Sequence, residues 1–191
     1  MYLRMNLVIM SNSHLESLRF NAMTLDNQAS TYQLKVTLQG SKPSIWRRVL
    51  VPASMNLLEL HHTLQIVMGW QDEHLHEFIH KKRRYGIPEV GYDDDTVDEL
   101  EIPLGELLKK EGDALVYLYD FGDGWRHEVL LEKIRPSRAD EELPRCTAGA
   151  RACPPEEVGG IHGYERLLKI LRKPSHEEYE DMLEWVGDDF D

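Results

Sequence analysis

Residues 114–134, ALVYLYDFGDGWRHEVLLEKI, constrain the fold more than any other part of the chain. Two apolar runs flank the dipeptide Asp123-Gly124, and Asp-Gly is a strong signal for a two-residue type I′ turn, which needs positive φ at both positions. The segment predicts an antiparallel hairpin that turns at or next to Asp123-Gly124, with strands over 114–120 and 125–134. An antiparallel sheet is therefore the expected basis of the fold.

The tip of this hairpin carries more polar groups than a turn requires. With Asp123 and Gly124 as the two turn residues, Asp120 lies directly across from His127. A carboxylate in that position favours the imidazolium form and fixes the orientation of the ring, which suits a general acid/base pair. The same pair also suits a structural clamp at the end of a sheet, with Trp125 capping the core. The sequence leaves both interpretations open.

A strand pair and a helix precede the hairpin. Residues 32–38, YQLKVTL, alternate between apolar and polar, and residues 44–51, SIWRRVLV, follow after a glycine and a proline, so the two predict an antiparallel pair. Residues 56–69 then change to helical spacing. Asn56 can cap this helix, and Gly69 follows its last turn.

The remaining segments add one strand and three helices. We expect a strand at 74–82, an acidic surface loop at 88–101, a short helix at 104–112, a long loop at 135–160, and helices at 163–173 and 176–187. Together these predict an α+β fold with a mainly antiparallel sheet, one helix after the first strand pair, and two C-terminal helices packed on the sheet. Residues 1–30 show no sustained period, so we expect an N-terminal extension followed by a single domain at 31–191.

Charge and cysteine content limit the partners. Lys and Arg number 22 against 34 Asp and Glu, and a net charge of -12 does not attract a polyanion such as DNA. We expect the patch KKRRY at 81–85 to be a solvated strand end, not a nucleic-acid contact. No stretch approaches the roughly 18 apolar residues that span a bilayer. Without a recognisable cleavable signal the chain is expected to be cytoplasmic, with Cys146 and Cys153 reduced and unpaired.

The sequence assigns no cofactor, but its histidines and cysteines suggest a divalent metal ion as one alternative. His74 and His76 share a face of the predicted strand, and this spacing can bind a metal, with Cys146 and Cys153 as further soft ligands. The spacing of the cysteines is not that of a zinc knuckle, and no Cys-x-x-Cys is present. His61 lies on the apolar stripe of the first helix and is expected to be a core histidine instead of a ligand.

Several consecutive motifs resemble one known family. The sequence contains no G-x-S-x-G, no Walker loop, no dinucleotide fingerprint and no H-E-x-x-H. It does contain, in this order, IWRRVLVP, LHHTLQIVMGW followed by HLHEF, YDFGDGWRHEVLLEK, and PRCTAGARACPPEEVGGIHGYERLL. From about Thr31 to Asp191 these motifs resemble the plasmid pRiA4b ORF-3-like family, whose usual CPPED-x-GG has Glu157 here in place of its aspartate.

The resemblance implies a fold more than an activity, because the family is largely uncharacterised. Some members carry names linked to plasmids or insertion elements. That leaves one further function open, an accessory protein of a mobile genetic element with weak nucleic-acid contact.

The function favoured from sequence is a binding module with a polar pocket for a small ligand, a peptide or an ion. We expect the hairpin tip and the CPPEEVGG loop to share one cleft, although more than 25 residues separate them, because polar loops are where function concentrates. Arg151 is the expected partner of an acid in that cleft. The candidate ligand-binding residues are Asp120, Asp123, Trp125, His127, Arg151, Glu156 and Glu157.

The alternative is a hydrolase in which His127, oriented by Asp120, acts as a base on water. In this alternative the hydrolysis would proceed with or without a metal ion bound at His74 and His76. The binding module is favoured because the sequence offers no recognisable nucleophile and no recognisable oxyanion device.

Overall fold

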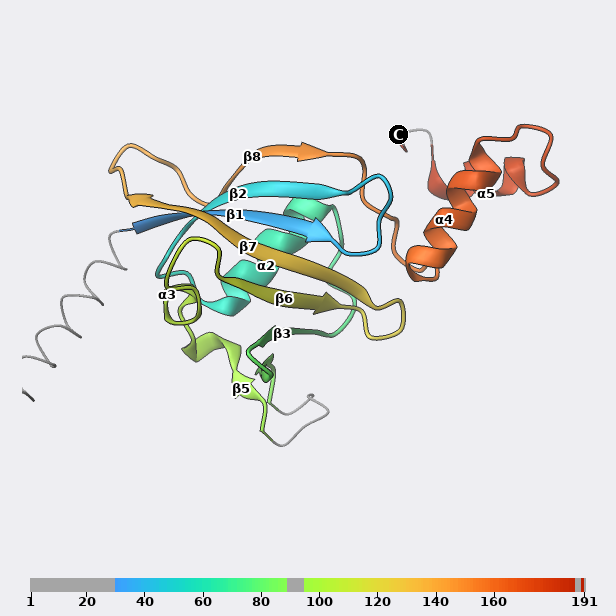
Figure 1. The fold of residues 1–191 in the computed structure, drawn as a ribbon. Coiled ribbons are helices and arrows are strands. Elements are labelled where there is room, and N and C mark those ends of the chain that lie inside the picture. Colours follow the sequence, from blue (N-terminus) through green and yellow to red (C-terminus); the bar gives the residue numbers. More distant parts are fainter. Residues whose placement is uncertain (1–29, 89–94, 188–189, 191) are drawn as a thin grey trace, which may run out of the picture.

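One twisted sheet forms the body of the molecule (Figure 1). The computed structural model describes residues 30–88, 95–187 and 190, and the expected N-terminal extension lies outside them except for Ser30. The described strands follow the order β5-β4-β3-β6-β7-β1-β2-β8, and every pair is antiparallel except β4 with β5. Their bounds are β1 Ser30–Leu38, β2 Trp46–Pro52, β3 His76–His80, β4 Arg83–Gly86, β5 Val97–Asp98, β6 Ala114–Tyr119, β7 Trp125–Pro136 and β8 Arg145–Ala150.

Helix α2 (Leu57–Met68) forms where the sequence predicts a helix, and it covers one face of the sheet (Figure 1). Asn56 accepts a hydrogen bond from the Glu59 amide, and the Glu59 side chain accepts one from the Asn56 amide, which completes a capping box. The helix ends at Gly69 in the left-handed conformation. Fully buried leucines of α2 pack against the alternating apolar residues of β1, and this contact forms the core.

The predicted hairpin is confirmed, but its expected register is wrong. Tyr119 pairs with Trp125, and His127 pairs with Tyr117 instead of Asp120. The Asp120 carboxylate explains the difference, because its Oδ1 atom accepts from the amides of Gly122 and Asp123, at 2.8 and 3.3 Å. This local bonding holds Asp120–Gly124 in a longer connection, so the Asp-Gly dipeptide does not form a two-residue turn.

Three strands were missed because their sequences lack an apolar alternation. β8 lies within the predicted loop at 135–160 and pairs with the edge of β2 although most of its residues are exposed. β4 follows β3 after only two residues, Lys81 and Lys82, whose φ angles of 48 and 71° are those of a type I′ turn. The expected acidic loop at 88–101 contains β5 and a short 3-10 helix, η1 (Glu99–Glu101), while residues 89–94 lie outside the described part.

The helices complete the α+β class, which is confirmed. Helix α3 (Leu104–Leu107) is shorter than the predicted 104–112. Helices α4 (Gly160–Leu171) and α5 (Tyr179–Val186) lie side by side beyond the end of the sheet, not over its face (Figure 1). Buried Tyr164 and Leu167 join α4 to the hydrophobic core. Within the described residues, no helix is long and apolar enough to cross a membrane.

Candidate functional site

The hairpin tip and the loop after Cys153 lie against each other, which brings together segments that are distant in sequence. The Gly159 amide donates to Asp123 Oδ2 at 3.1 Å, and the Trp70 indole donates to the Pro154 carbonyl at 3.1 Å. We call this region the junction site and define it by His74, Tyr119, Asp120, Glu156 and Glu157. The juxtaposition expected from sequence is therefore present.

Glu156 is tied to the sheet and to the loop before β3. The Tyr119 hydroxyl donates to Glu156 Oε1 at 2.6 Å, and the Gln71 amide donates to the same oxygen at 3.2 Å. Burial, and then the bond to Glu156, raise the pKa of Tyr119 well above its ordinary value. The Tyr119 hydroxyl therefore stays protonated near pH 7 and remains the donor in its bond to Glu156.

His74 lies between two other carboxylates. Its Nε2 atom is 2.9 Å from Glu157 Oε1 and 3.9 Å from Asp120 Oδ2, yet it has no aligned hydrogen bond within the described residues. The Asp120 residue is 7% exposed, whereas the Glu157 side chain is 73% exposed. The imidazole therefore joins a buried acid to an acid that reaches solvent.

The backbone around His74 is strained. Asp72, Asp120 and Glu157 have φ angles of 61, 54 and 61°, in the left-handed region that non-glycine residues seldom occupy. Aspartate tolerates this region through local hydrogen bonds, as Asp120 shows, but glutamate has no such general preference. Strained residues of this kind gather at ligand sites, where the surrounding structure holds them in place.

Four buried side-chain atoms of the described residues have no hydrogen-bond partner, and they lie in the junction site, in strand β7 and in η1. They are His74 Nε2, Glu99 Oε1, Trp125 Nε1 and His127 Nε2. Buried polar atoms in native proteins are nearly always paired, so each exception calls for a water, an ion or a ligand. These atoms distinguish the region from an ordinary packed core.

The expected Asp120–His127 pair is wrong. His127 is fully buried, its ring contacts Trp70 edge-on at 5.2 Å, and its Nδ1 atom is 3.4 Å from the Tyr117 carbonyl oxygen. Burial lowers the pKa of His127 to about 4, so the ring is neutral near pH 7. A neutral imidazole sealed from solvent and unpaired with Asp120 has no access to a water molecule that it would activate.

A second cluster, missed from sequence, lies next to the junction site, and we call it the central histidine site. It consists of His61, Asp72, His76 and Glu99. His61 Nε2 is 2.7 Å from Asp72 Oδ1, His76 Nε2 is 2.9 Å from Glu99 Oε2, and the two imidazole rings stack with centroids 3.5 Å apart. His61 and His76 come from α2 and β3, so only the packing of helix on sheet brings them together.

Hydrogen bonds fix the tautomer of His61. Burial and the neighbouring His76 lower the pKa of His61 to about 4, against the opposing effect of Asp72. The neutral ring donates from Nε2 to the Asp72 carboxylate, so Nδ1 accepts from the Tyr117 hydroxyl at 2.8 Å. The Gln65 amide donates to the same hydroxyl at 2.9 Å.

The metal ligands expected from sequence do not come together. His74 precedes β3 and faces Asp120 and Glu157, whereas His76 faces Glu99. Cys146 is exposed on the edge strand β8, and Cys153 lies 3.5 Å from the Met68 sulfur. Both cysteines are free, and burial raises the pKa of Cys153 to about 11, which disfavours the thiolate that a metal requires.

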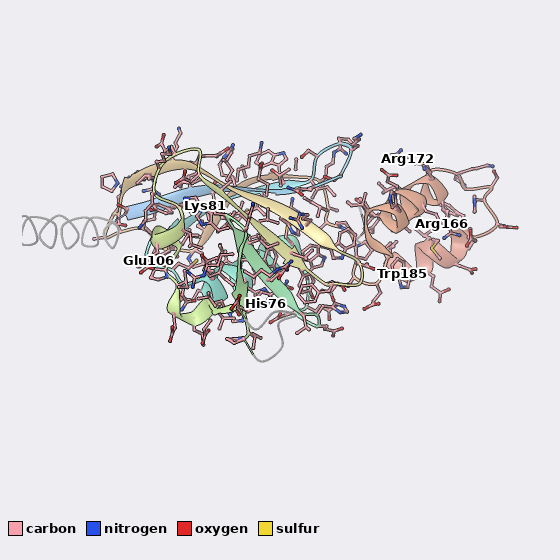
Figure 2. The ribbon with its side chains drawn as sticks, turned by 60° about the horizontal axis from the view of Figure 1, so that its bottom comes forward. His76, Lys81, Glu106, Arg166, Arg172 and Trp185 are labelled. Atoms are coloured by element: carbon pink, nitrogen blue, oxygen red, sulfur yellow. The ribbon has the colours of Figure 1, made fainter. Side chains whose placement is uncertain are left out.

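Arg151 does not meet the acids of the junction site. It lines a different hollow with Lys42, Tyr164 and Arg172, and no described acid forms an ion pair with it. Arg151 directly follows the last residue of β8, and its φ is 69°. His76 lies on the body of the molecule, apart from Arg172 and Trp185 on the C-terminal helices (Figure 2).

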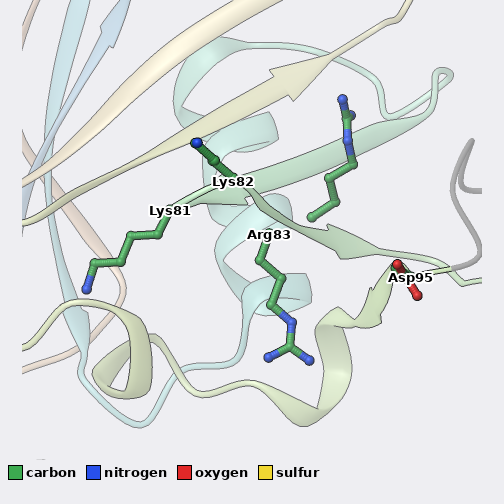
Figure 3. Close-up of a pocket in the computed structure, with 5 residues that line it drawn as sticks. Lys81, Lys82, Arg83 and Asp95 are labelled. Atoms are coloured by element: carbon green, nitrogen blue, oxygen red, sulfur yellow. The ribbon is translucent and has the colours of Figure 1, made fainter.

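A basic hollow surrounds the β3–β4 turn. Lys81, Lys82, Arg83, Arg84 and Asp95 line it, and the labelled cations extend in different directions from the turn (Figure 3). Arg84 pairs with Glu77. Diverging cations on a strand end do not form a focused anion site, which agrees with the solvated strand end expected from sequence.

The fold defines the class of protein first: an α+β domain whose mainly antiparallel sheet carries a helix on one face and two helices at its end. The chain belongs to the plasmid pRiA4b ORF-3-like protein family, whose model matches residues 30–191. An uncharacterised protein of Sinorhizobium fredii is 39% identical over 160 residues, which are 83% of this chain and 82% of the relative. A crystal structure of a protein of unknown function from Methanosarcina mazei is 43% identical, with a TM-score of 0.76, and the match covers 85% of this chain and 92% of the other.

Proposed function

We propose that this protein is a binding module, and that its junction site holds a small molecule or a peptide end through a positively charged amine. The observation that carries the proposal is His74 Nε2, which is buried without an aligned hydrogen bond while it faces Asp120 and Glu157. An amine between these acids would pair with two carboxylates in a site that is partly removed from water.

The three acids of the junction site differ in how many hydrogen-bond acceptor positions of their carboxylates remain free. Glu156 already accepts two hydrogen bonds at one oxygen, and Asp120 accepts two amides at Oδ1. Asp120 Oδ2 and the exposed end of Glu157 keep acceptor capacity, because a carboxylate offers about four lone-pair sites. An amine therefore fits between Asp120 and Glu157, beside His74.

The charge of the whole chain supports a cationic ligand. A net charge of -12 attracts cations by the long-range field and repels anions. Trp70 and Tyr119 stack with ring centroids 4.9 Å apart, and Tyr119 packs edge-on against His74, so buried aromatic rings hold this imidazole in place.

The hydrolase alternative is less well supported. Its base was His127 oriented by Asp120, and the observed strand register separates the two. His74 faces carboxylates but no nucleophilic side chain among its described contacts. Binding is therefore the function that the geometry supports best.

Putrescine, a diamine, and its N-acetylated form provide the test. We expect saturating putrescine, at 100 times its dissociation constant, to raise the unfolding free energy by about 2.7 kcal/mol, and diacetylputrescine to have no effect. Asp120→Asn and His74→Gln should lose the response, whereas the exposed-site control His162→Gln should keep it. An equal response to diacetylputrescine, or no response of the wild type to putrescine, would refute an amine site.

A further inference from the structure

We infer that the central histidine site binds one divalent transition-metal ion, with His61 and His76 as nitrogen ligands and Asp72 and Glu99 as oxygen ligands. This site is distinct from the junction site and goes beyond the proposed amine binding. Ligand atoms of His61, Asp72 and His76 all lie within 4.8 Å of one another. Glu99 adjoins them through its 2.9 Å contact with His76.

Glu99 provides the independent observation. Its side chain is only 2% exposed, and its Oε1 atom has no hydrogen-bond partner in the described part of the chain. Oε1 shares a carboxylate with Oε2, which contacts His76, so the unpaired oxygen lies beside the same imidazole. A purely structural network leaves a buried acid half satisfied, which is costly, whereas a cation nearby would stabilise its charge.

The donor set selects the class of ion. Two imidazoles and two carboxylates are the ligands of Zn²⁺ and of its neighbours Mn²⁺, Fe²⁺ and Co²⁺, and the set has no soft sulfur. Ca²⁺ and Mg²⁺ favour oxygen ligands alone. Zinc is therefore a suitable first probe, and cobalt a spectroscopic substitute.

The surroundings of His61 are those of a supported ligand. The Tyr117 hydroxyl contacts Nδ1 at 2.8 Å, and Gln65 holds that hydroxyl in turn. The Gln65 side-chain oxygen also accepts from the Asp72 amide at 3.0 Å, so one residue positions two ligands. When Nε2 binds an ion and Nδ1 carries the proton, the Tyr117 hydroxyl oxygen accepts that proton's hydrogen bond and orients the ring, as the partners of metal-binding histidines do.

Ring stacking has a consequence for binding. The ring planes of His61 and His76 are within 5° of parallel, so the nitrogen lone pairs of the two stacked rings lie in parallel planes and do not point at one common position. Coordination of one ion by both rings requires one ring to tilt. The nitrogens that face Asp72 and Glu99 now carry the imidazole protons. Coordination through them requires each neutral ring to take the other tautomer, with its proton on Nδ1, where the proton of His61 is donated to the Tyr117 hydroxyl oxygen.

The experiment uses the full chain, stripped with a chelator and then titrated with Zn²⁺ by calorimetry, with Co²⁺ absorption as a second readout. We expect one ion per chain and cobalt d–d bands of a four-coordinate site. His61→Gln, His76→Gln and Glu99→Gln should each weaken binding at least tenfold. The matched control is His80→Gln, on the same strand and the same face as His76, which should bind zinc normally.

Two results would overturn the inference. One is the absence of stoichiometric zinc or cobalt binding by the folded wild-type chain, which needs no variant. The other is unchanged binding by Glu99→Gln or His76→Gln whose circular dichroism matches the wild type. His74→Gln separates this site from the junction site, because it should lose the putrescine response and retain zinc.

Discussion

Single buried side chains decide what this end of the sheet can do. Aspartate at position 120 uses one oxygen to build the turn and leaves the other facing His74. His127, the base of the hydrolase alternative, is sealed in the core, and burial lowers its pKa to about 4, so the ring is neutral near pH 7. The sequence named Asp120, Glu156 and Glu157 as candidates, and the structure places them close together. The sequence did not name His61, Asp72 and Glu99 as a cluster, because nothing in their spacing reveals that α2, a loop and η1 meet.

His127 should make the stability of the protein depend on pH. Its pKa is about 4 in the folded chain and about 6.5 when unfolded, so the unfolded chain binds more protons between these values. Stability that is present above pH 6.5 is therefore lost as the pH falls toward 4, by about 3 kcal/mol at most for this group. Urea unfolding at several pH values should show a shallower dependence for His127→Gln than for the wild type. Identical slopes, with exposed His162→Gln as reference, would mean that His127 is not buried in neutral form.

At the scale of elements, helices and strands with strong hydrophobic periodicity were predicted well, whereas short strands and exposed edge strands of the sheet were not. Helix α2 and strands β1, β2, β6 and β7 follow from alternation, helical spacing and caps. β4, β5 and β8 are short or exposed edge strands, which are recruited by the neighbouring strand and not by their own residues. The residue types also predicted the two-residue turn at the wrong place. Asp123-Gly124 has a sequence typical of a type I′ turn, yet Lys81-Lys82 has the φ angles of one.

The Lys81-Lys82 turn offers a gain in stability. Both lysines hold positive φ angles, where asparagine and glycine are favoured. Lys81→Asn with Lys82→Gly should raise the unfolding free energy by about 1 kcal/mol. Lys81→Gln with Lys82→Gln removes the same charges without relieving the backbone, and should not reproduce the gain. Equal effects of the two pairs in urea titrations would show that charge, not backbone strain, dominates.

At the scale of the whole molecule, the start of helix α4 lies against Asp123 of the hairpin tip, beside the junction site. The α+β fold class was predictable because two amphipathic segments follow the strands. The position of these two helices beyond the end of the sheet was not predictable, since it depends on a close contact at Gly160. A Cβ atom at Gly160 would lie 2.5 Å from the Asp123 carbonyl oxygen, in a residue with φ of 66°. This glycine lets α4 begin against the hairpin tip.

Gly160→Ala should therefore loosen the attachment of α4. Gly187 is the matched control, because its φ is 78° but no atom lies within 4 Å of its added Cβ. We expect Gly187→Ala to lower the unfolding free energy by about 1 kcal/mol and Gly160→Ala by roughly 2 to 4 kcal/mol, since only the latter adds a clash. Thermal unfolding measures both. Equal losses would show that backbone strain alone acts, and that the contact with Asp123 is not restrictive.

The most direct measurement for the proposed function is nitrogen NMR of the His74 imidazole during addition of putrescine. The amine-binding account predicts that the His74 Nε2 resonance moves saturably, that His162 stays unchanged, and that Asp120→Asn abolishes the movement in a chain that remains folded. A His74 resonance that stays fixed at saturating putrescine, or that moves equally in Asp120→Asn, would contradict binding at the junction site.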